Sequence, residues 1–255
     1  FRGMPGLQAG IMSGAAHLDE LNEKLRATCY VRRNKADVLK ELPAKQRAEV
    51  PVAISNRTEY QRAERELIAW LRERAAQDKE FLAAIKDLSE EEQRVRKEAR
   101  ADDAAEKARR AERLVKIEAL KQVAARGKIE AAKEWIESFL ETGEKLVVFA
   151  WHREIVNAIA EMFSCDSITG ETSLEKRQAA VDKFQTDPNC RIIALNVQAG
   201  GVGLTLTAAS NVVFLELGWT PATHDQAEDR CHRIGQEDQV TAWYLLAEQT
   251  IDETI

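Results

Sequence analysis

The second half of the chain alternates between mostly apolar runs and segments whose apolar residues recur at helical spacing. An uninterrupted apolar run is typical of a strand that is buried on both faces, and apolar positions three and four apart predict a helix. Strands that alternate with helices predict an α/β fold, with a parallel sheet and helices on both faces. The strands are expected at 145–151, 166–169, 191–197, 211–217 and 240–247, and the helices at 128–141, 152–163, 174–186 and 221–233.

The first half has a different pattern. Residues 1–16 are rich in glycine and predict a loop, and residues 30–43 predict a short basic helix that Pro43 ends. Residues 47–54 alternate between polar and apolar positions, as in a strand. Pro51 lies within this segment and cannot donate a hydrogen bond to a sheet, so we expect an edge strand.

Two long helices are predicted between residues 57 and 126. Ser89 with Glu92 has the spacing of a capping box, and Asn56 with Glu59 is a similar pair. The helices should therefore run from 57 to about 88 and from 89 to about 126, where Gly127 ends the second. Few apolar residues occur between 90 and 113, so we expect the hairpin to project into solvent. Its charges indicate either a solvated face or an arm that contacts DNA or a protein partner.

The net charge of −6 argues against a protein that coats nucleic acid non-specifically. A few placed phosphate contacts remain compatible with it. The four cysteines are scattered without a CxxC pair, which disfavours a zinc site or a disulfide framework. We therefore expect a reducing compartment, in cytoplasm, nucleoid or nucleus. No apolar run approaches the ~20 residues of a membrane span, and no metal site is predicted.

Three polar residues near the end of the chain are the main candidates for chemistry. Gln226, Arg230 and Arg233 are spaced four and three apart, so on a helix they share one face. An arginine stays charged, and its planar fork pairs with phosphate oxygens. This face therefore suits a triphosphate. The alternative is that the arginines form ion pairs with Glu228 and Asp229.

A glycine-rich loop follows the strand predicted at 191–197. Gly200, Gly201 and Gly203 leave backbone N–H groups bare, so a phosphate could approach them closely. The alternative is a tight packing turn.

The segment 226–236, Gln-Ala-Glu-Asp-Arg-Cys-His-Arg-Ile-Gly-Gln, resembles the last helicase motif of the Swi/Snf family of superfamily-two ATPases. The resemblance continues over most of the chain but leaves out the hairpin. The other segments that resemble the family are 32–45, 145–151, 168–185, 199–211 and 213–221.

The family moves along duplex DNA and hydrolyses ATP. The resemblance implies an inter-lobe junction in 1–56, a helical protrusion in 57–127 and a C-terminal RecA-like lobe in 128–255, truncated at its end. It implies catalytic arginine fingers and a nucleotide site, formed by Arg230 and Arg233 and by Gln226, Gly201 and Gly203. It also implies contacts with the DNA backbone from Thr169, Gly170, Thr172, Asn196, Gln198, Gly200 and Trp219.

The chain departs from the family pattern at three places. Asn196 and Gln198 stand where the family has Ser and Arg in Ser-Thr-Arg, and amides can also donate to phosphate. Thr220 replaces an asparagine. Glu216 replaces an aspartate and points to the fork-remodelling, annealing-helicase branch.

The sequence contains no G-x-x-x-x-G-K-[ST] motif and no Asp-Glu-x-His box. ATP and Mg²⁺ are therefore expected to bind mainly to an N-terminal lobe elsewhere in a longer protein, and this chain alone should not hydrolyse ATP. Its expected partners are that lobe and duplex DNA. Two alternatives remain: a protein-interaction module on a RecA-like platform, or the lobe of an RNA helicase.

Overall fold

The computed structural model describes residues 17–29, 35–66, 79–86, 88–110, 112–200 and 203–254, together with residues 69 and 73. The chain divides into two units, residues 1–41 and residues 42–255. The first unit contains helices α1 (Leu18–Thr28) and α2 (Lys35–Val38). The predicted loop at 1–16 lies outside the described residues, as do residues 30–34 of the predicted basic helix.

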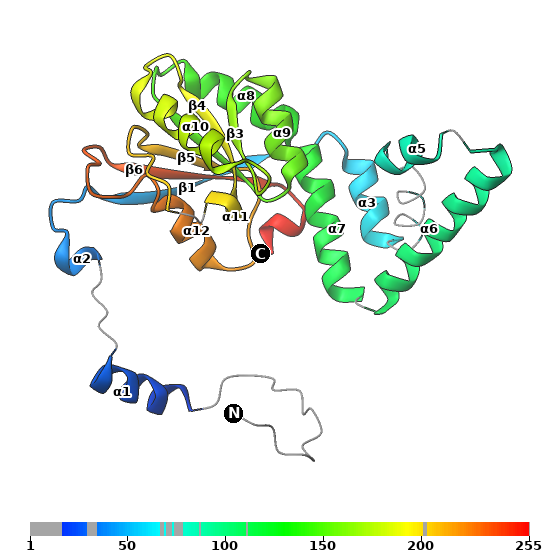
Figure 1. The fold of residues 1–255 in the computed structure, drawn as a ribbon, viewed down its shortest axis with the longest axis horizontal. Helices are drawn as coiled ribbons and strands as arrows, with labels where there is room; N and C mark the ends of the chain where they lie inside the picture. Colours follow the sequence, from blue (N-terminus) through cyan, green and yellow to red (C-terminus); the bar gives the residue numbers. More distant parts are fainter. Residues whose placement is uncertain are drawn as a thin grey trace. The chain divides into compact units, whose positions relative to one another are not determined.

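The second unit is built on a parallel sheet in the order β1-β6-β5-β2-β4-β3 (Figure 1). Each predicted strand is present, so the predicted α/β sheet is confirmed. The strands are β1 (Lys45–Val52), β2 (Leu146–Ala150), β3 (Asp166–Ile168), β4 (Ile192–Asn196), β5 (Asn211–Phe214) and β6 (Val240–Ala247).

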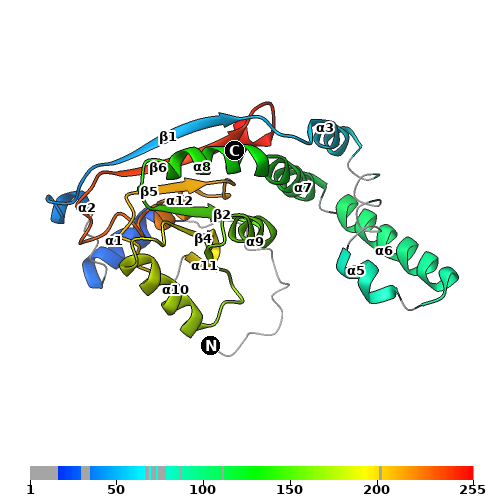
Figure 2. The ribbon, with the colours of Figure 1, turned by 90° about the horizontal axis from the view of Figure 1, so that it is seen from above.

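β1 lies at one edge of the sheet, as Pro51 predicts, and it runs alongside β6 (Figure 2). The register pairs Lys45 with Val240 and Val52 with Ala247. A strand from the predicted junction segment thus completes the sheet of the lobe. The division of the chain after residues 56 and 127 stays a prediction.

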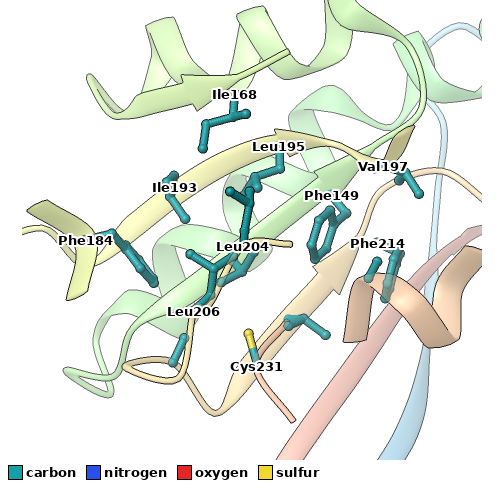
Figure 3. Close-up of a cluster of buried hydrophobic side chains, with 14 of the residues drawn as sticks. Phe149, Ile168, Phe184, Ile193, Leu195, Val197, Leu204, Leu206, Phe214 and Cys231 are labelled. Atoms are coloured by element: carbon teal, nitrogen blue, oxygen red, sulfur yellow. The ribbon is translucent and has the colours of Figure 1, made fainter. Parts of the chain in front are cut away.

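Alternate residues of each strand pack against helices on opposite faces, as the pleat of a strand requires. One face of the sheet packs against α8 (Ile129–Leu140) and α9 (Arg153–Met162). The other packs against α10 (Leu174–Thr186), α12 (Pro221–Glu228) and the loop after α11 (Val197–Gly200). Figure 3 shows this second cluster, in which Phe149 and Phe214 lie at the centre and stack with 5.3 Å between ring centroids.

Among the described residues, the predicted hairpin comprises α3 (Arg57–Arg65), α5 (Lys79–Ile85), α6 (Glu90–Arg110) and α7 (Glu112–Gly127). The prediction of one helix from 57 to about 88 is wrong, because Glu66 is not helical. No glycine or proline encodes this end. α3 packs on α7 through Tyr60 and Ala63, and Glu66 follows its last residue with its N–H bonded to the carbonyl of Arg62.

The two capping pairs have different outcomes. Ser89 and Glu92 form the predicted capping box, with Ser89 N donating to Glu92 Oε2 at 3.0 Å. The Asn56 side chain does not cap α3. Instead, Asn56 Nδ2 donates to the carbonyl of Val123 on α7 at 3.0 Å. The second predicted helix, from 89 to about 126, corresponds to α6 and α7. The first half of α6 is exposed to solvent, as predicted, whereas the last ten residues of α7 are largely buried.

Gly127 is the last residue of α7, and the segment at 54–56 passes too close to it for a side chain. A Cβ at this position would lie 2.0 Å from Asn56 Oδ1 and 2.8 Å from Ile54 Cβ. We therefore expect Gly127→Ala to lower the free energy of unfolding by about 1–3 kcal/mol, as overpacking does. Urea unfolding of the chain measures this loss. Gly170→Ala is the matched control, since its Cβ would meet nothing within 4 Å, and an equal loss in both variants would contradict the expectation.

Candidate nucleotide and nucleic-acid site

Arg230 and Arg233 lie beyond the end of α12, so the predicted helix from 221 to 233 is too long. Beyond Glu228 the backbone tightens, because Arg230 N and Cys231 N donate to carbonyls three residues back, those of Ala227 and Glu228. The carbonyl of Arg230 in turn accepts a bond from Leu206 N at 2.9 Å, which joins this turn to the loop after α11. The prediction that both arginines share a helix face with the exposed Gln226 is therefore wrong.

The two arginines lie beside the loop that follows α11. The guanidinium of Arg233 donates to the carbonyl of Leu204 at 3.1 Å and to Thr205 Oγ1 at 3.3 Å. Burial and the nearby charge of Arg233 lower the pKa of Arg230. Gly203 lies in the same loop with a φ of 55°, and Gly201 lies outside the described residues. Two neighbouring guanidiniums repel each other, so an anion placed between them would be stabilised.

Glu228 does not serve as the ion-pair partner of these arginines. Its buried carboxylate accepts hydrogen bonds from Lys45 Nζ at 2.6 Å, from Arg47 Nε at 2.7 Å and from the hydroxyl of Tyr244 at 2.6 Å. Burial raises the pKa of Glu228, but these bonds outweigh it and leave the pKa lowered. The network fastens the end of α12 to the edge strand β1, so the Glu228 carboxylate is engaged away from the two arginines.

A second candidate region is a hollow of about 430 Å³ at the carboxyl ends of β3 and β4. Four of the residues predicted to contact DNA line it, together with two arginines that the sequence reading did not single out. The lining residues are Arg153, Thr169, Gly170, Glu171, Arg177, Asn196 and Gln198.

The basic side chains of the hollow are differently engaged. Arg153 forms an ion pair with Glu171. Arg177 Nη2 donates to the carbonyl of Thr169 at 3.4 Å, whereas its buried Nε has no hydrogen-bond partner among the described residues. Arg153 and Arg177 come from α9 and α10, so only the packing of these helices on the sheet brings them together.

Several of the predicted DNA contacts form hydrogen bonds that shape the loops around the hollow. The hydroxyl of Thr172 accepts a bond from Thr169 N at 2.9 Å, and Thr172 does not line the hollow. Asn196 Nδ2 donates to the carbonyl of Trp151 at 2.5 Å, and Asn196 Oδ1 accepts a bond from Gln198 N at 3.0 Å. Gly200 is the last residue of α11.

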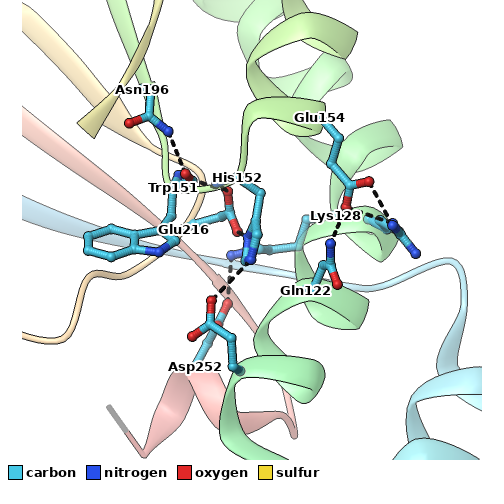
Figure 4. A network of polar contacts seen from close by, with 10 residues as sticks. Gln122, Lys128, Trp151, His152, Glu154, Asn196, Glu216 and Asp252 are labelled. Atoms are coloured by element: carbon cyan, nitrogen blue, oxygen red, sulfur yellow. Dashed lines mark hydrogen bonds and ion pairs between the residues drawn. The ribbon is translucent and has the colours of Figure 1, made fainter. Parts of the chain in front are cut away.

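Next to the hollow, Glu216 joins the segments that follow β2 and β5 (Figure 4). Its buried carboxylate accepts bonds from the backbone N–H groups of Trp151 and His152, each at 2.8 Å, and His152 Nδ1 lies 2.5 Å from Glu216 Oε1. Burial lowers the pKa of His152, but Glu216 and Glu118 outweigh this effect and raise it. An acidic residue in a mostly apolar strand was the sequence signal for this network.

The described part of the chain contains no group of three or more His, Cys, Asp and Glu residues arranged to hold a metal ion. None of the helices described is long and apolar enough to cross a bilayer.

Residues 127–235 match the family described as the helicase conserved C-terminal domain. The chain is 35% identical over 247 residues to the SWI/SNF-related matrix-associated actin-dependent regulator of chromatin subfamily A-like protein 1 of Xenopus tropicalis. This alignment covers 94% of this chain and 23% of that protein. It is 34% identical over 245 residues to the DNA annealing helicase and endonuclease ZRANB3 of Mus musculus, covering 94% of this chain and 20% of that protein. The chain therefore spans about a fifth of the length of these relatives.

Two solved structures share the fold. The C-terminal part of the Fun30 ATPase domain aligns with a TM-score of 0.57 at 19% identity, over 84% of this chain and 88% of that one. The Sulfolobus solfataricus SWI2/SNF2 ATPase core in complex with dsDNA aligns with a TM-score of 0.56 at 22% identity, over 92% of this chain and 48% of that one. With the helicase motifs and the parallel sheet, these matches lead to one conclusion: the chain belongs to the Swi/Snf family of helicase-like ATPases and forms a C-terminal RecA-like lobe of that family.

Proposed function

We propose that the protein containing this chain moves along double-stranded DNA and uses ATP to do so. In this proposal the lobe supplies Arg230 and Arg233 to the nucleotide and grips the DNA backbone at the hollow lined by Arg153 and Arg177. The observation that carries the proposal is the segment 196–205. Its first residues line the hollow, and its last residues bind the guanidinium of Arg233, so one short segment contacts both regions.

The two arginines suit the phosphates of ATP. A guanidinium stays charged and offers two parallel N–H groups to phosphate oxygens. Held by the loop carbonyls, Arg233 is oriented before ATP arrives, so little reorganisation is needed when charge develops on the transferring phosphoryl group. Mg²⁺ bound with ATP would neutralise phosphate charge, and we expect its ligands in the other lobe. Gln226, Gly201 and Gly203 remain proposed nucleotide contacts.

The hollow suits a sugar-phosphate backbone rather than base edges. Its cationic groups come from Arg153, which is paired with Glu171, and from Arg177, and the small residues Thr169 and Gly170 also line it. Contacts of this kind fix position on DNA without reading its sequence. Closure of the two lobes on ATP and their reopening after hydrolysis would then move the grip along one strand. Thr172, Gly200 and Trp219 remain proposed neighbours of the strand.

The test is ATP hydrolysis by the longer protein without nucleic acid and with duplex DNA, forked DNA, single-stranded DNA or RNA. Stimulation by duplex or forked DNA several-fold above the other substrates is expected. Preferential stimulation by RNA would favour the RNA helicase alternative. A rate that no nucleic acid changes would contradict the proposal and favour an interaction module. The relatives include a regulator of chromatin and a DNA annealing helicase, which supports an intracellular site of action on DNA.

Arg177→Gln should weaken duplex binding and make it less dependent on salt. Loss of one phosphate contact is expected to reduce the slope of log K against log salt by about 0.9. Fluorescence anisotropy of a labelled duplex at several salt concentrations measures this slope. The matched control is Lys133→Gln on α8, which removes one exposed positive charge elsewhere. An equal change of slope in both variants would mean that net charge, not the hollow, determines binding.

A further inference from the structure

The C-terminal half of α7 contacts the lobe through a row of polar side chains, which are Glu118, Gln122 and Arg126. Gln122 and Arg126 both donate to Glu154 on α9. One turn earlier, Glu118 Oε1 lies 3.1 Å from Nε2 of His152, which follows β2. The row therefore joins the helical protrusion to the same segment that Glu216 holds in Figure 4.

Lys121 lies beside this row and has an unusual environment. Its side chain is only 2% exposed, and Nζ has no hydrogen-bond partner among the described residues. Instead, Nζ lies 4.7 Å from the ring centroid of Trp219 and 5.3 Å from that of Trp151. A buried ammonium that makes no hydrogen bond is costly, so the two indole faces are its main compensation. Burial lowers its pKa, and Glu118 and Glu216 oppose this effect.

Gly218, which precedes Trp219, packs closely against His224 and Trp151. Gly218 N donates to Nε2 of His224 at 2.8 Å, and a Cβ on Gly218 would lie 3.2 Å from the ring of Trp151. By contrast, Trp219 itself is 42% exposed, and Pro221 begins α12 just after it. The Trp219 indole therefore has solvent on its open side, and the lysine of α7 lies over its ring.

We propose that Lys121 is a positioning residue that fixes the Trp219 indole for contact with DNA. The protrusion, whose role the sequence left open, would thereby influence how the lobe grips its substrate. This inference rests on the proposed function, because Trp219 is there a neighbour of the DNA strand. Lys121 itself would not touch DNA.

The first test needs no activity. In this chain, the contribution of Trp219 to fluorescence is the difference between the parent sequence and Trp219→Phe. We expect Lys121→Met to make that contribution more accessible to acrylamide, and Lys121→Arg, which keeps a cation over the ring, to restore it. The matched control is Lys116→Met on the same helix. Unchanged quenching in a folded Lys121→Met chain would overturn the inference, whether or not the proposed function holds.

The second test uses the longer protein. Lys121→Met should raise the duplex concentration that gives half-maximal ATP hydrolysis by roughly 3- to 10-fold, the range that corresponds to a cation–π contact, and should affect kcat less. Lys121→Arg should restore the value. Equal losses in the Met and Arg variants, in step with lost stability, would show a structural role and overturn the inference. If the unmodified protein is not stimulated by DNA at all, the proposed function fails, and the quenching result alone decides whether Lys121 positions Trp219.

Discussion

Replacement of Arg233 by alanine is expected to slow DNA-stimulated ATP hydrolysis by the longer protein roughly 10³–10⁵-fold, which is the effect of an arginine finger. The guanidinium is oriented by the carbonyl of Leu204 and the hydroxyl of Thr205, so its charge is already in place for the phosphates. Arg233→Lys should recover little, because an ammonium lacks the planar fork. Single-turnover hydrolysis at saturating ATP and DNA measures the effect.

The matched control is Arg94→Ala on α6, which removes an exposed arginine paired with Glu91. Because Arg233 also bonds to the loop, urea unfolding must show that the alanine variant remains folded. A folded Arg233→Ala protein that hydrolyses ATP at the rate of the control would contradict the assignment. The proposed phosphate contact would then rest on Arg230 alone, and Arg230→Ala would be measured in the same way.

Replacement of Asp252 by alanine is expected to lower the free energy of unfolding by about 3–5 kcal/mol, because it leaves a buried charge without its partner. Lys128 Nζ lies 2.6 Å from Asp252 Oδ2, and both side chains are almost fully buried (Figure 4). Lys128 also donates to the carbonyl of Leu245, and Asp252 also accepts from Ala247 N. The pair therefore ties the start of α8 to β6 and to the short helix η1 (Ile251–Glu253). Urea unfolding of this chain at neutral pH measures the loss.

Two further variants distinguish the loss of the buried Lys128–Asp252 ion pair from the effect of removing a single charge. Lys128→Met combined with Asp252→Ala should lower the free energy of unfolding by less than the sum of the two single losses, because neither charge is then left buried alone. Lys133→Met, which breaks an exposed pair with Glu137, should lose no more than about 1 kcal/mol. Additive effects of the two buried changes would mean that Lys128 and Asp252 act independently.

Much of the fold was predictable because it depends on local pattern. The apolar runs locate the strands of the sheet, since a strand buried on both faces needs such a run. Pro51 predicted an edge strand because it has no N–H to donate. The Ser89–Glu92 box predicted the start of α6, because both partners lie within one helical turn. The resemblance of segment 226–236 to the last helicase motif of the Swi/Snf family also pointed to the correct family.

Other features depend on contacts between segments that are far apart in the chain. The turn that carries Arg230 is joined to the loop after α11, because Leu206 N donates to the carbonyl of Arg230. Arg153 and Arg177 meet in one hollow only because α9 and α10 pack on the sheet. The environment of Lys121 requires α7 to lie beside the turn of Trp219. The sequence by itself thus determined the strands, the start of α6 and the family, whereas tertiary structure decided which charged side chains meet and what surrounds them, because those outcomes depend on hydrogen bonds and packing between distant segments.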